Sequence, residues 1–261
     1  MEFIKKSLLR TEGLTKRFGG LVVMDGLDMS VREGEIHGLL GPNGAGKSTF
    51  FNLVTGVLKP TAGKIYYDDM MDITNAKPHQ VAKMGIGRTF QLNPLFGEFT
   101  VEENIMAAQY LHPHSTVPQV YFNTKTYREN EKEAANYTKF ILEFLNMTGI
   151  KDVKAKALPH GYQKLLGVAR ALAIKPKLLM LDEPLGGMNP EEIHFTLDAI
   201  NKMNKEIGIT ILIVEHNMQV LDICNDVTVI AFGKKIFDGT AEAVRDDAEV
   251  NRVYFGGVEY E

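Results

Sequence analysis

The sequence predicts an α/β fold with a mainly parallel core sheet, an N-terminal antiparallel β subdomain and an inserted helical subdomain. Three observations support this prediction. A glycine-rich segment at 41–49 lies between a short apolar run and a helical pattern. Later in the chain, apolar runs alternate with a helical pattern, which is typical of a parallel sheet buried on both faces. Between these parts, residues 100–171 are mainly amphipathic helical patterns.

Length and composition allow one domain with a sizeable core, because 44 % of the 261 residues are hydrophobic. A formal net charge of −4 gives no electrostatic footprint for nucleic acid, so we expect no nucleic-acid partner. Cys224 is the one cysteine, which excludes an intrachain disulfide and a cysteine-based zinc site. We expect it to be a small buried side chain on a helix.

The N-terminus has an early acid, Glu2, and lacks a sustained apolar run, so it does not resemble a secretory signal. No apolar segment approaches the roughly 20 residues that a membrane-spanning helix needs. We therefore expect a cytoplasmic protein that reaches a membrane only through partners.

Short alternating patterns predict the antiparallel β subdomain at the start of the chain. Apolar and polar residues alternate before a turn that contains Phe18 and two glycines, and a second cluster of turn residues follows at 58–63. The predicted strands cover residues 8–17, 21–24, 27–31 and 64–67.

The glycine-rich segment is Gly41-Pro42-Asn43-Gly44-Ala45-Gly46-Lys47-Ser48-Thr49, which fits the phosphate-binding P-loop pattern. Gly44 and Gly46 allow consecutive backbone N–H groups to point into one concavity, because glycine reaches positive φ without steric penalty. Lys47 adds a positive charge for the β and γ phosphates, and the Ser48 hydroxyl can ligate Mg²⁺. A strand before the loop and a helix after it would aim the helix N-terminus at the phosphates. The segment therefore predicts a nucleoside triphosphate site.

The helical subdomain is predicted from a helix start and from apolar periodicity. Thr100 followed by Glu103 forms a capping box, which begins a helix. Segment 112–126 contains proline and turn residues and predicts a loop. Two further helices are predicted at 127–147 and 161–174.

The core sheet resumes in the last third of the chain. Apolar runs at 178–181, 209–214 and 227–232, with a helical pattern at 191–204, predict parallel strands joined by crossovers. The first run leads into Asp182 and Glu183, at the strand edge where α/β sheets bind ligands. There Asp182 can hold Mg²⁺ and Glu183 can polarise an attacking water.

The motifs occur in the order and spacing of an ATP-binding-cassette (ABC) transporter ATPase subunit, and the resemblance covers nearly the whole chain. Besides the P-loop, they are Gln91, Leu181-Asp182-Glu183-Pro184 and Glu215-His216. Three features resemble the branched-chain amino acid uptake family, in the longer of its two ATPase types. They are Asn189-Pro190, the long segment between Gln91 and the signature region, and the tail Val253-Tyr254-Phe255-Gly256.

The resemblance implies a P-loop NTPase core within a single ABC ATPase domain over residues 1–261. Within it, the core and the antiparallel β subdomain are expected at 1–99 and 172–261. The helical subdomain is expected at 100–171.

The resemblance also implies roles for four residues outside the P-loop and the acidic pair. Phe18 matches the aromatic residue that stacks on adenine, although a core position at a strand end is the alternative. Gln91 matches the glutamine that reaches Mg²⁺ and the attacking water, in a loop that touches the membrane subunits. His216 matches the switch histidine that contacts the γ-phosphate. Asn189, where Asp is commoner, matches the loop that crosses to the partner subunit.

The signature segment departs from the family pattern Leu-Ser-Gly-Gly-Gln. Here it is Leu158-Pro159-His160-Gly161-Tyr162, followed by Gln163 and Lys164. In the family this segment presents a serine hydroxyl and N–H groups to ATP bound on the opposite subunit. Pro159 supplies neither hydroxyl nor N–H, whereas Gly161 keeps the close backbone approach. His160 is a candidate to replace a lost donor.

The implied activity is hydrolysis of ATP bound between Lys47 of one chain and Gly161 of another. Water would be oriented by Glu183 and His216. Mg²⁺ would be held by Ser48, Gln91 and Asp182.

The implied partners make an importer for branched-chain amino acids or a related small amide. They are a second ABC ATPase subunit (identical or a paralogue), two membrane permease subunits and, indirectly, an external solute-binding protein. The chain would then be peripheral on the inner face of the cell membrane.

Two alternatives remain at this point. One is a regulatory nucleotide-binding module that hydrolyses slowly because of Pro159, against which Glu183 and His216 argue. The other is a soluble ABC ATPase that acts on ribosomes or DNA. Such proteins usually carry two cassettes or a long coiled coil, and this sequence has neither, nor a basic surplus.

Overall fold

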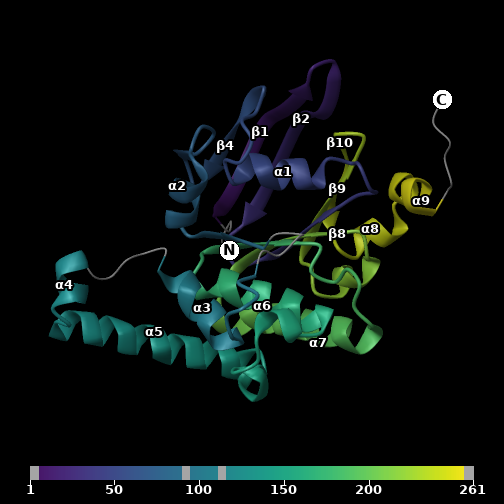
Figure 1. Cartoon of the computed structure of the whole chain (residues 1–261). Coiled ribbons are helices and arrows are strands. Elements are labelled where there is room, and N and C mark those ends of the chain that lie inside the picture. Colours follow the sequence, from purple (N-terminus) through teal and green to yellow (C-terminus); the bar gives the residue numbers. More distant parts are fainter. Residues whose placement is uncertain (1–5, 90–94, 111–115, 256–261) are drawn as a thin grey trace, which may run out of the picture.

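The structure, a computed structural model, describes residues 6–89, 95–110 and 116–255, and it contains two sheets with helices packed around them (Figure 1). The first sheet is antiparallel and has the strand order β2-β1-β4-β5. Its strands are β1 (Ser7–Phe18), β2 (Leu21–Arg32), β4 (Ala62–Tyr67) and β5 (Met71–Asp72). The predicted antiparallel β subdomain is confirmed.

The two strands predicted at 21–24 and 27–31 are one strand, β2, so that prediction is wrong. Lys16 pairs with Met24 and Leu14 with Leu27, which leaves one extra residue on β2 between the two pairs. This is a β-bulge, in which Gly26 has a φ of 65°. A glycine that looks like a break in the sequence therefore bends a continuous strand.

The second sheet forms the core and has the strand order β10-β9-β3-β8-β7-β6. Every neighbouring pair is parallel except β10 with β9, so the predicted mainly parallel sheet is confirmed. Its strands are β3 (Ile36–Leu40), β6 (Ile86–Arg88), β7 (Leu178–Asp182), β8 (Thr210–Glu215), β9 (Asp226–Ala231) and β10 (Lys234–Thr240). The half-exposed β10 lacks a continuous apolar run, which is why the sequence pattern misses it.

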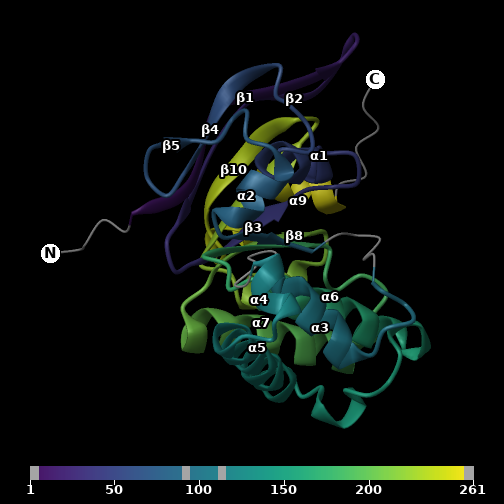
Figure 2. The same cartoon turned by 60° about the vertical axis from the view of Figure 1, so that its left-hand side comes forward.

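Alternate residues of the strands in the second sheet pack into two separate hydrophobic clusters, one on each face. Leu181 and Ile213 join the cluster that contains the helical subdomain, whereas Met180 and Leu212 join the cluster beneath the antiparallel sheet. Helices α1 (Lys47–Val54) and α2 (Pro78–Lys83) lie on the second side. Helix α7 (Pro190–Ile207) lies on the first (Figures 1 and 2). Burial on both faces explains the uninterrupted apolar runs of these strands.

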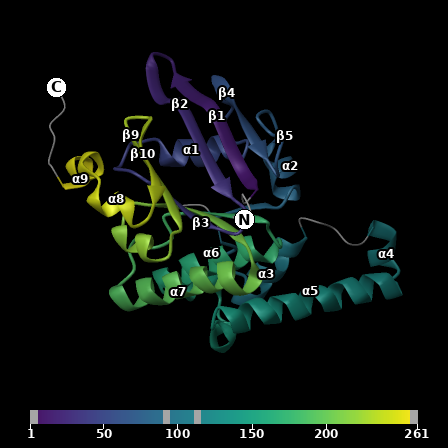
Figure 3. The same cartoon turned by 180° about the vertical axis from the view of Figure 1, so that it is seen from behind.

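The helical subdomain contains four helices and two short 3₁₀ turns among the described residues, and Thr100 caps the first helix as predicted. The helices are α3 (Val101–Gln109), α4 (Val117–Tyr121), α5 (Lys125–Phe144) and α6 (His160–Ala173), and the turns are Thr148–Ile150 and Ala155–Ala157. Helix α5 extends outward from the body of the molecule, with α4 beside its outer end (Figures 1 and 3).

Helix α4 lies within the segment 112–126 that was predicted to be a loop, so this prediction is wrong for 117–121. Pro118 occupies the first turn of the helix, where proline is accepted because its missing N–H would have no partner there. Thr116 and Gln119 form a capping box. Pro118, which looks like a turn residue in the sequence, therefore marks the start of a helix.

The C-terminal part ends in α8 (Ala243–Asp246) and α9 (Ala248–Phe255). Cys224 follows the 3₁₀ helix Met218–Asp222 and lies in irregular backbone, so the predicted helical position is wrong. Burial raises the pKa of its thiol to about 12, consistent with an inert packing role. Within the described part of the chain, none of the helices combines the length and apolar character needed to span a bilayer.

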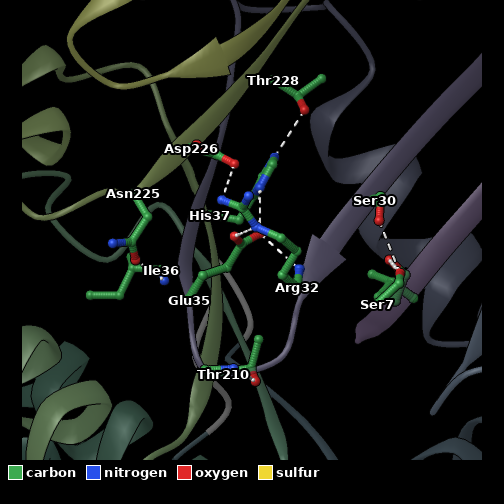
Figure 4. A network of polar contacts seen from close by, with 12 residues as sticks. Ser7, Ser30, Arg32, Glu35, Ile36, His37, Thr210, Asn225, Asp226 and Thr228 are labelled. Atoms are coloured by element: carbon green, nitrogen blue, oxygen red, sulfur yellow. Dashed lines mark hydrogen bonds and ion pairs between the residues drawn. The ribbon is translucent and has the colours of Figure 1, made fainter. Parts of the chain in front are cut away.

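A buried polar network joins the two sheets at the start of β3 (Figure 4). His37 lies between Glu35 and Thr228: its Nδ1 is 3.0 Å from Glu35 Oε1, and its Nε2 is 2.9 Å from Thr228 Oγ1. Arg32 at the end of β2 donates its backbone N–H and Nε to Glu35, at 2.8 and 2.7 Å, and pairs with Asp226 of β9. This network fixes the entry of the chain into the P-loop strand.

Candidate nucleotide-binding site

The P-loop encloses an open cavity at the carboxyl end of β3. Gly44 and Gly46 have φ values of 81° and 105°, so the expected need for glycine is confirmed at these positions. Gly41 is required for a different reason, because a Cβ there would lie 2.2 Å from the backbone oxygen of Ile230. The cavity has a volume of about 320 Å³. It is lined by Val23, Asn43, Gly44, Ala45, Gly46, Lys47, Ser48, Thr49 and Glu183.

Lys47 folds back onto its own loop. Its Nζ donates hydrogen bonds to the carbonyl oxygens of Gly41 and Pro42, at 2.6 and 2.9 Å. Burial lowers the pKa of Lys47, while the carboxylates of Glu183, Glu215 and Asp182 oppose this effect. The ammonium group therefore lies at the cavity wall, where an anionic ligand would stabilise its charge.

Asp182 ends β7 and is buried beside a cation. Its Oδ2 accepts a hydrogen bond from Arg88 at 3.0 Å, whereas Oδ1 is buried and has no hydrogen-bond partner among the described residues. Burial raises the pKa of Asp182, although Arg88 acts in the opposite direction. A buried carboxylate oxygen without a donor is the kind of group that the hydration shell of a hard cation satisfies, so the site fits Mg²⁺.

Glu183 is held in a left-handed conformation with a φ of 46°. Its backbone N–H donates to Val214 O at 3.0 Å, and its carbonyl oxygen accepts from Lys164 Nζ at 2.7 Å. Glu183 is one of the residues that line the P-loop cavity. His216, after β8, places Nδ1 4.0 Å from Glu183 Oε1. The two residues predicted to orient water thus lie next to each other at the phosphate loop.

Glu215 anchors this corner; the sequence placed it in the Glu215-His216 motif but gave it no role of its own. Its carboxylate is fully buried and accepts hydrogen bonds from the backbone N–H groups of Leu185 and His216, at 2.8 and 3.1 Å. Burial raises its pKa, although these hydrogen bonds oppose the effect. A carboxylate that directly follows the four apolar residues 211–214 is the signal that could have identified it. Arg88, at the end of β6, gave no such signal.

Phe18 is exposed at the end of β1. Its side chain is not part of either core, so the alternative of a core residue is wrong. Lys16 Nζ lies 5.0 Å from the ring centroid. An exposed flat ring beside a cation can accept a base on one face, as the stacking prediction requires.

The signature segment begins α6 and lies outside the P-loop cavity. Pro159 is the N-cap of α6, so its missing N–H leaves no helical bond unmade. Gly161 is buried, and a Cβ there would lie 2.6 Å from a carboxylate oxygen of Glu192. None of the described residues 158–163 lines the P-loop cavity.

Of two other predicted site residues, the structure describes Asn189 but not Gln91. Asn189 is the N-cap of α7, where its Oδ1 accepts from the N–H groups of Glu191 and Glu192, both at 3.0 Å. The side chain therefore has a local structural function. Gln91 lies outside the described residues, so its predicted contacts with Mg²⁺ and water stay predictions.

Sequence comparison finds a family match and close relatives. Residues 24–186 match the family described as ABC transporter. The high-affinity branched-chain amino acid transport ATP-binding protein BraF of Pseudomonas aeruginosa is 38 % identical, over 97 % of this chain and 99 % of its own. LivG of Escherichia coli, with the same description, is 35 % identical over the same shares of both chains.

Solved structures agree with this assignment. The ADP conformation of MJ1267, an ATP-binding cassette of an ABC transporter, is 35 % identical and covers 96 % of this chain and 99 % of its own, with a TM-score of 0.82. A nucleotide-free ATP-binding cassette from an ABC transporter is 34 % identical and gives the same coverage and TM-score. A P-loop after β3, an acidic pair at the end of β7 and this overall similarity lead to one conclusion: the chain belongs to the ATP-hydrolysing cassettes of the ABC transporter family.

Proposed function

We propose that this ATPase energises the import of branched-chain amino acids or a related small amino acid or amide. Relatives with 35–38 % identity over nearly the full chain carry branched-chain amino acid transport in their names. The main observation behind the proposed catalysis is the position of Glu183, which lines the P-loop cavity and has its Oε1 4.0 Å from His216 Nδ1.

In the proposed mechanism the P-loop glycines and Lys47 bind the phosphates. N–H groups of the loop would donate to phosphate oxygens, and Lys47 would exchange its carbonyl partners, Gly41 and Pro42, for phosphate oxygens. Glu183 accepts a proton from the attacking water, and His216 orients that water and contacts the γ-phosphate. Phe18 stacks on the adenine.

The metal site is proposed at Ser48, Asp182 and Gln91. When bound there, Mg²⁺ would neutralise developing charge on the β and γ phosphates. The unpartnered Oδ1 of Asp182 supports this assignment. We expect Asp182→Asn to raise the Mg²⁺ concentration required for half-maximal turnover about tenfold or more, while ATP binding in the presence of a chelator stays within twofold. An unchanged Mg²⁺ requirement would reject Asp182 as a metal-site residue.

A second ATPase subunit is part of the proposal because the signature segment of the same chain lies outside the P-loop cavity. ATP would be bound between Lys47 of one subunit and Gly161 of the other, with Leu158, Tyr162 and Gln163 supporting this segment and Asn189 in the crossing loop. His160, exposed at the start of α6, is proposed to donate to the nucleotide in place of the missing serine. A His160→Ala variant whose ATP turnover equals that of the unmodified chain would reject this donor role.

The permease contact is proposed at a second cavity of about 360 Å³, which is lined by residues of both the core and the helical subdomain. Apolar side chains such as Val81 and Ile86 line it, together with Ala108 of α3 and Arg88. Arg88 lines this cavity and also donates a hydrogen bond to Asp182. A membrane subunit bound in the cavity could therefore contact the metal site through the Arg88 side chain alone. Membership of the ABC transporter family and this proposed contact with a membrane subunit support a peripheral position of the chain on the inner face of the cell membrane.

The decisive experiment is Glu183→Gln in the full-length chain. We expect turnover to fall about 100-fold or more, because the amide cannot accept the proton, while the Kd for ATP stays within about threefold. Glu206→Gln, on the exposed side of α7, is the matched control and should retain full turnover. Turnover of Glu183→Gln within twofold of the unmodified chain would refute the catalytic assignment. Co-purification with two membrane permeases would support the transport assignment, which the family membership favours over a regulatory or soluble non-transport role.

A further inference from the structure

Lys164 connects the signature helix to the backbone of Glu183. It lies in the first turns of α6, and its Nζ donates a hydrogen bond of 2.7 Å to the carbonyl oxygen of Glu183. The side chain is partly buried, and burial lowers its pKa. Withdrawing a lysine from water is costly, so the ammonium group requires compensating partners at this position.

Glu183 needs such support because its backbone is strained. A φ of 46° is unfavourable for a residue with a Cβ, at about 1–2 kcal/mol. Two hydrogen bonds stabilise this conformation, one on each side of its Cα: the N–H donates to Val214 O at 3.0 Å, and the carbonyl accepts from Lys164. Fixing both peptide groups also fixes the direction of the Cα–Cβ bond, and thereby the position of the carboxylate of a residue that lines the P-loop cavity.

The loop after Glu183 rests on the same turn of α6. A Cβ on Gly186 would lie 2.9 Å from Lys164 Nζ, and a Cβ on Gly187 would lie 3.4 Å from the ring of His160. The lysine therefore fills the space that a larger residue at 186 would need. Displacement of α6 would be transmitted directly to the backbone of Glu183.

The charge of Lys164 also suits this position. Its ammonium group is attracted by the carboxylates of Glu215, Glu183 and Asp182, which gather at the ends of β7 and β8. Lys47 faces the same carboxylates but lies on the P-loop, where it would turn to phosphate. Lys164 would keep its place when the nucleotide binds.

We propose that Lys164 is a positioning residue for hydrolysis, which holds the left-handed backbone of Glu183 and couples the signature helix to it within one chain. This inference rests on the proposed function, because it requires Glu183 to act on the water. Lys164 itself does not touch the reacting atoms. Its effect should therefore appear in turnover and not in nucleotide binding.

The test uses Lys164→Met in the full-length chain, because methionine keeps an unbranched side chain but removes the donor. We expect kcat to fall about tenfold or more, as for the loss of one charge-assisted hydrogen bond, with KM and the Kd for ATP within twofold. Lys164→Arg, which keeps N–H donors and charge, should recover most of the turnover. Lys202→Met, at an exposed lysine of α7, is the control and should behave like the unmodified chain.

A double-mutant cycle separates positioning of Glu183 from a general structural role. If Lys164 acts through Glu183, Lys164→Met should cause no further loss in the residual turnover of Glu183→Gln, whereas independent effects would multiply and overturn the proposal. A parallel fall in ATP affinity and thermal stability would also overturn it. If Glu183→Gln is inactive but Lys164→Met keeps full kcat, only the positioning role fails. If Glu183→Gln keeps full turnover, the proposed function fails first.

Discussion

At the residue scale, the P-loop shows that glycines in one motif serve different steric needs. Gly44 has positive φ in open space, since a Cβ there would meet nothing within 4 Å. Gly46 combines positive φ with a close neighbour, because a Cβ would lie 2.9 Å from Val23 O on β2. Gly41 has no positive φ but approaches Ile230 O. The motif pattern alone does not distinguish these cases.

We predict that Gly46→Ala destabilises the fold more than Gly44→Ala does. Gly44→Ala should lower the free energy of unfolding by roughly 1 kcal/mol, the cost of a left-handed alanine. Gly46→Ala should cost roughly 3 kcal/mol, because the contact with the Val23 carbonyl is added to this strain. Urea denaturation of the nucleotide-free chain measures both values. Equal losses would show that the close contact with β2 relaxes freely.

At the scale of elements, Asn189 shows how one residue of a functional loop also starts a helix. Its side chain caps α7, and Glu192 Oε2 in turn accepts from the Asn189 N–H at 2.9 Å. The capping box sets the angle at which the loop 186–189 leaves the helix. The proposed contact with a partner subunit and the stability of α7 would therefore depend on the same side chain.

The capping role of Asn189 predicts different effects of two substitutions on stability, one of which serves as the control. Asn189→Ala should lower the free energy of unfolding by about 1 kcal/mol, because two N–H groups at the start of α7 lose their acceptor. Asn189→Asp should retain the stability, since a carboxylate accepts the same bonds and interacts favourably with the helix N-terminus. Both are measured by urea denaturation without nucleotide. If Asn189→Ala keeps the unmodified stability, the cap contributes nothing.

Elements with strong local signals were predicted well from the sequence, and elements defined by distant contacts were not. Strand β3, the P-loop helix and the capped start of α3 all follow from local pattern. Strand β10 is defined by its pairing with β9, which the local sequence does not show. Predicting α4 requires that Pro118 is recognised as a residue of the first helical turn. In the site, Lys164 was given no role and Arg88 was missed, because their partners, Glu183 and Asp182, are 19 and 94 residues away in the chain.

At the scale of the whole molecule, the network around Glu35 ties the antiparallel sheet to the core sheet. Burial raises the pKa of Glu35, but hydrogen bonds from His37 and Arg32 outweigh this effect and hold the pKa below its ordinary value. The stabilisation is therefore present above the ordinary glutamate pKa of about 4.3 and is lost as pH falls through the lower folded-state value. The network makes the junction of the two sheets sensitive to acid.

We predict that Glu35→Gln lowers the free energy of unfolding at pH 7 by about 1–3 kcal/mol, because the charge-assisted hydrogen bonds are lost. The variant should also lose less stability than the unmodified chain between pH 5 and the acid transition. Urea denaturation at a series of pH values measures both effects. Glu206→Gln, at an exposed site on α7, should leave the profile unchanged. A variant profile parallel to the unmodified one would show that Glu35 does not titrate with folding.

The outward course of α5 implies that one helix belongs to two cooperative units. Its buried residues, Thr138, Ile141 and Leu142, are near its end, and Gln109 of α3 holds the middle through hydrogen bonds to Ala134 O and Thr138 Oγ1. Helix α4 buries none of its residues. Isolated helical turns are marginal in water, so the outer end should open without the rest of the molecule.

Native-state hydrogen exchange would reveal this division. The amides of 120–130 should exchange through local openings that dilute urea does not affect, whereas those of Ile141 and Leu142 should follow global unfolding and respond steeply to urea. Uniform protection along α5 would contradict the division. If it holds, the outer turns could lose their helical structure and re-form it many times while the nucleotide site stays folded.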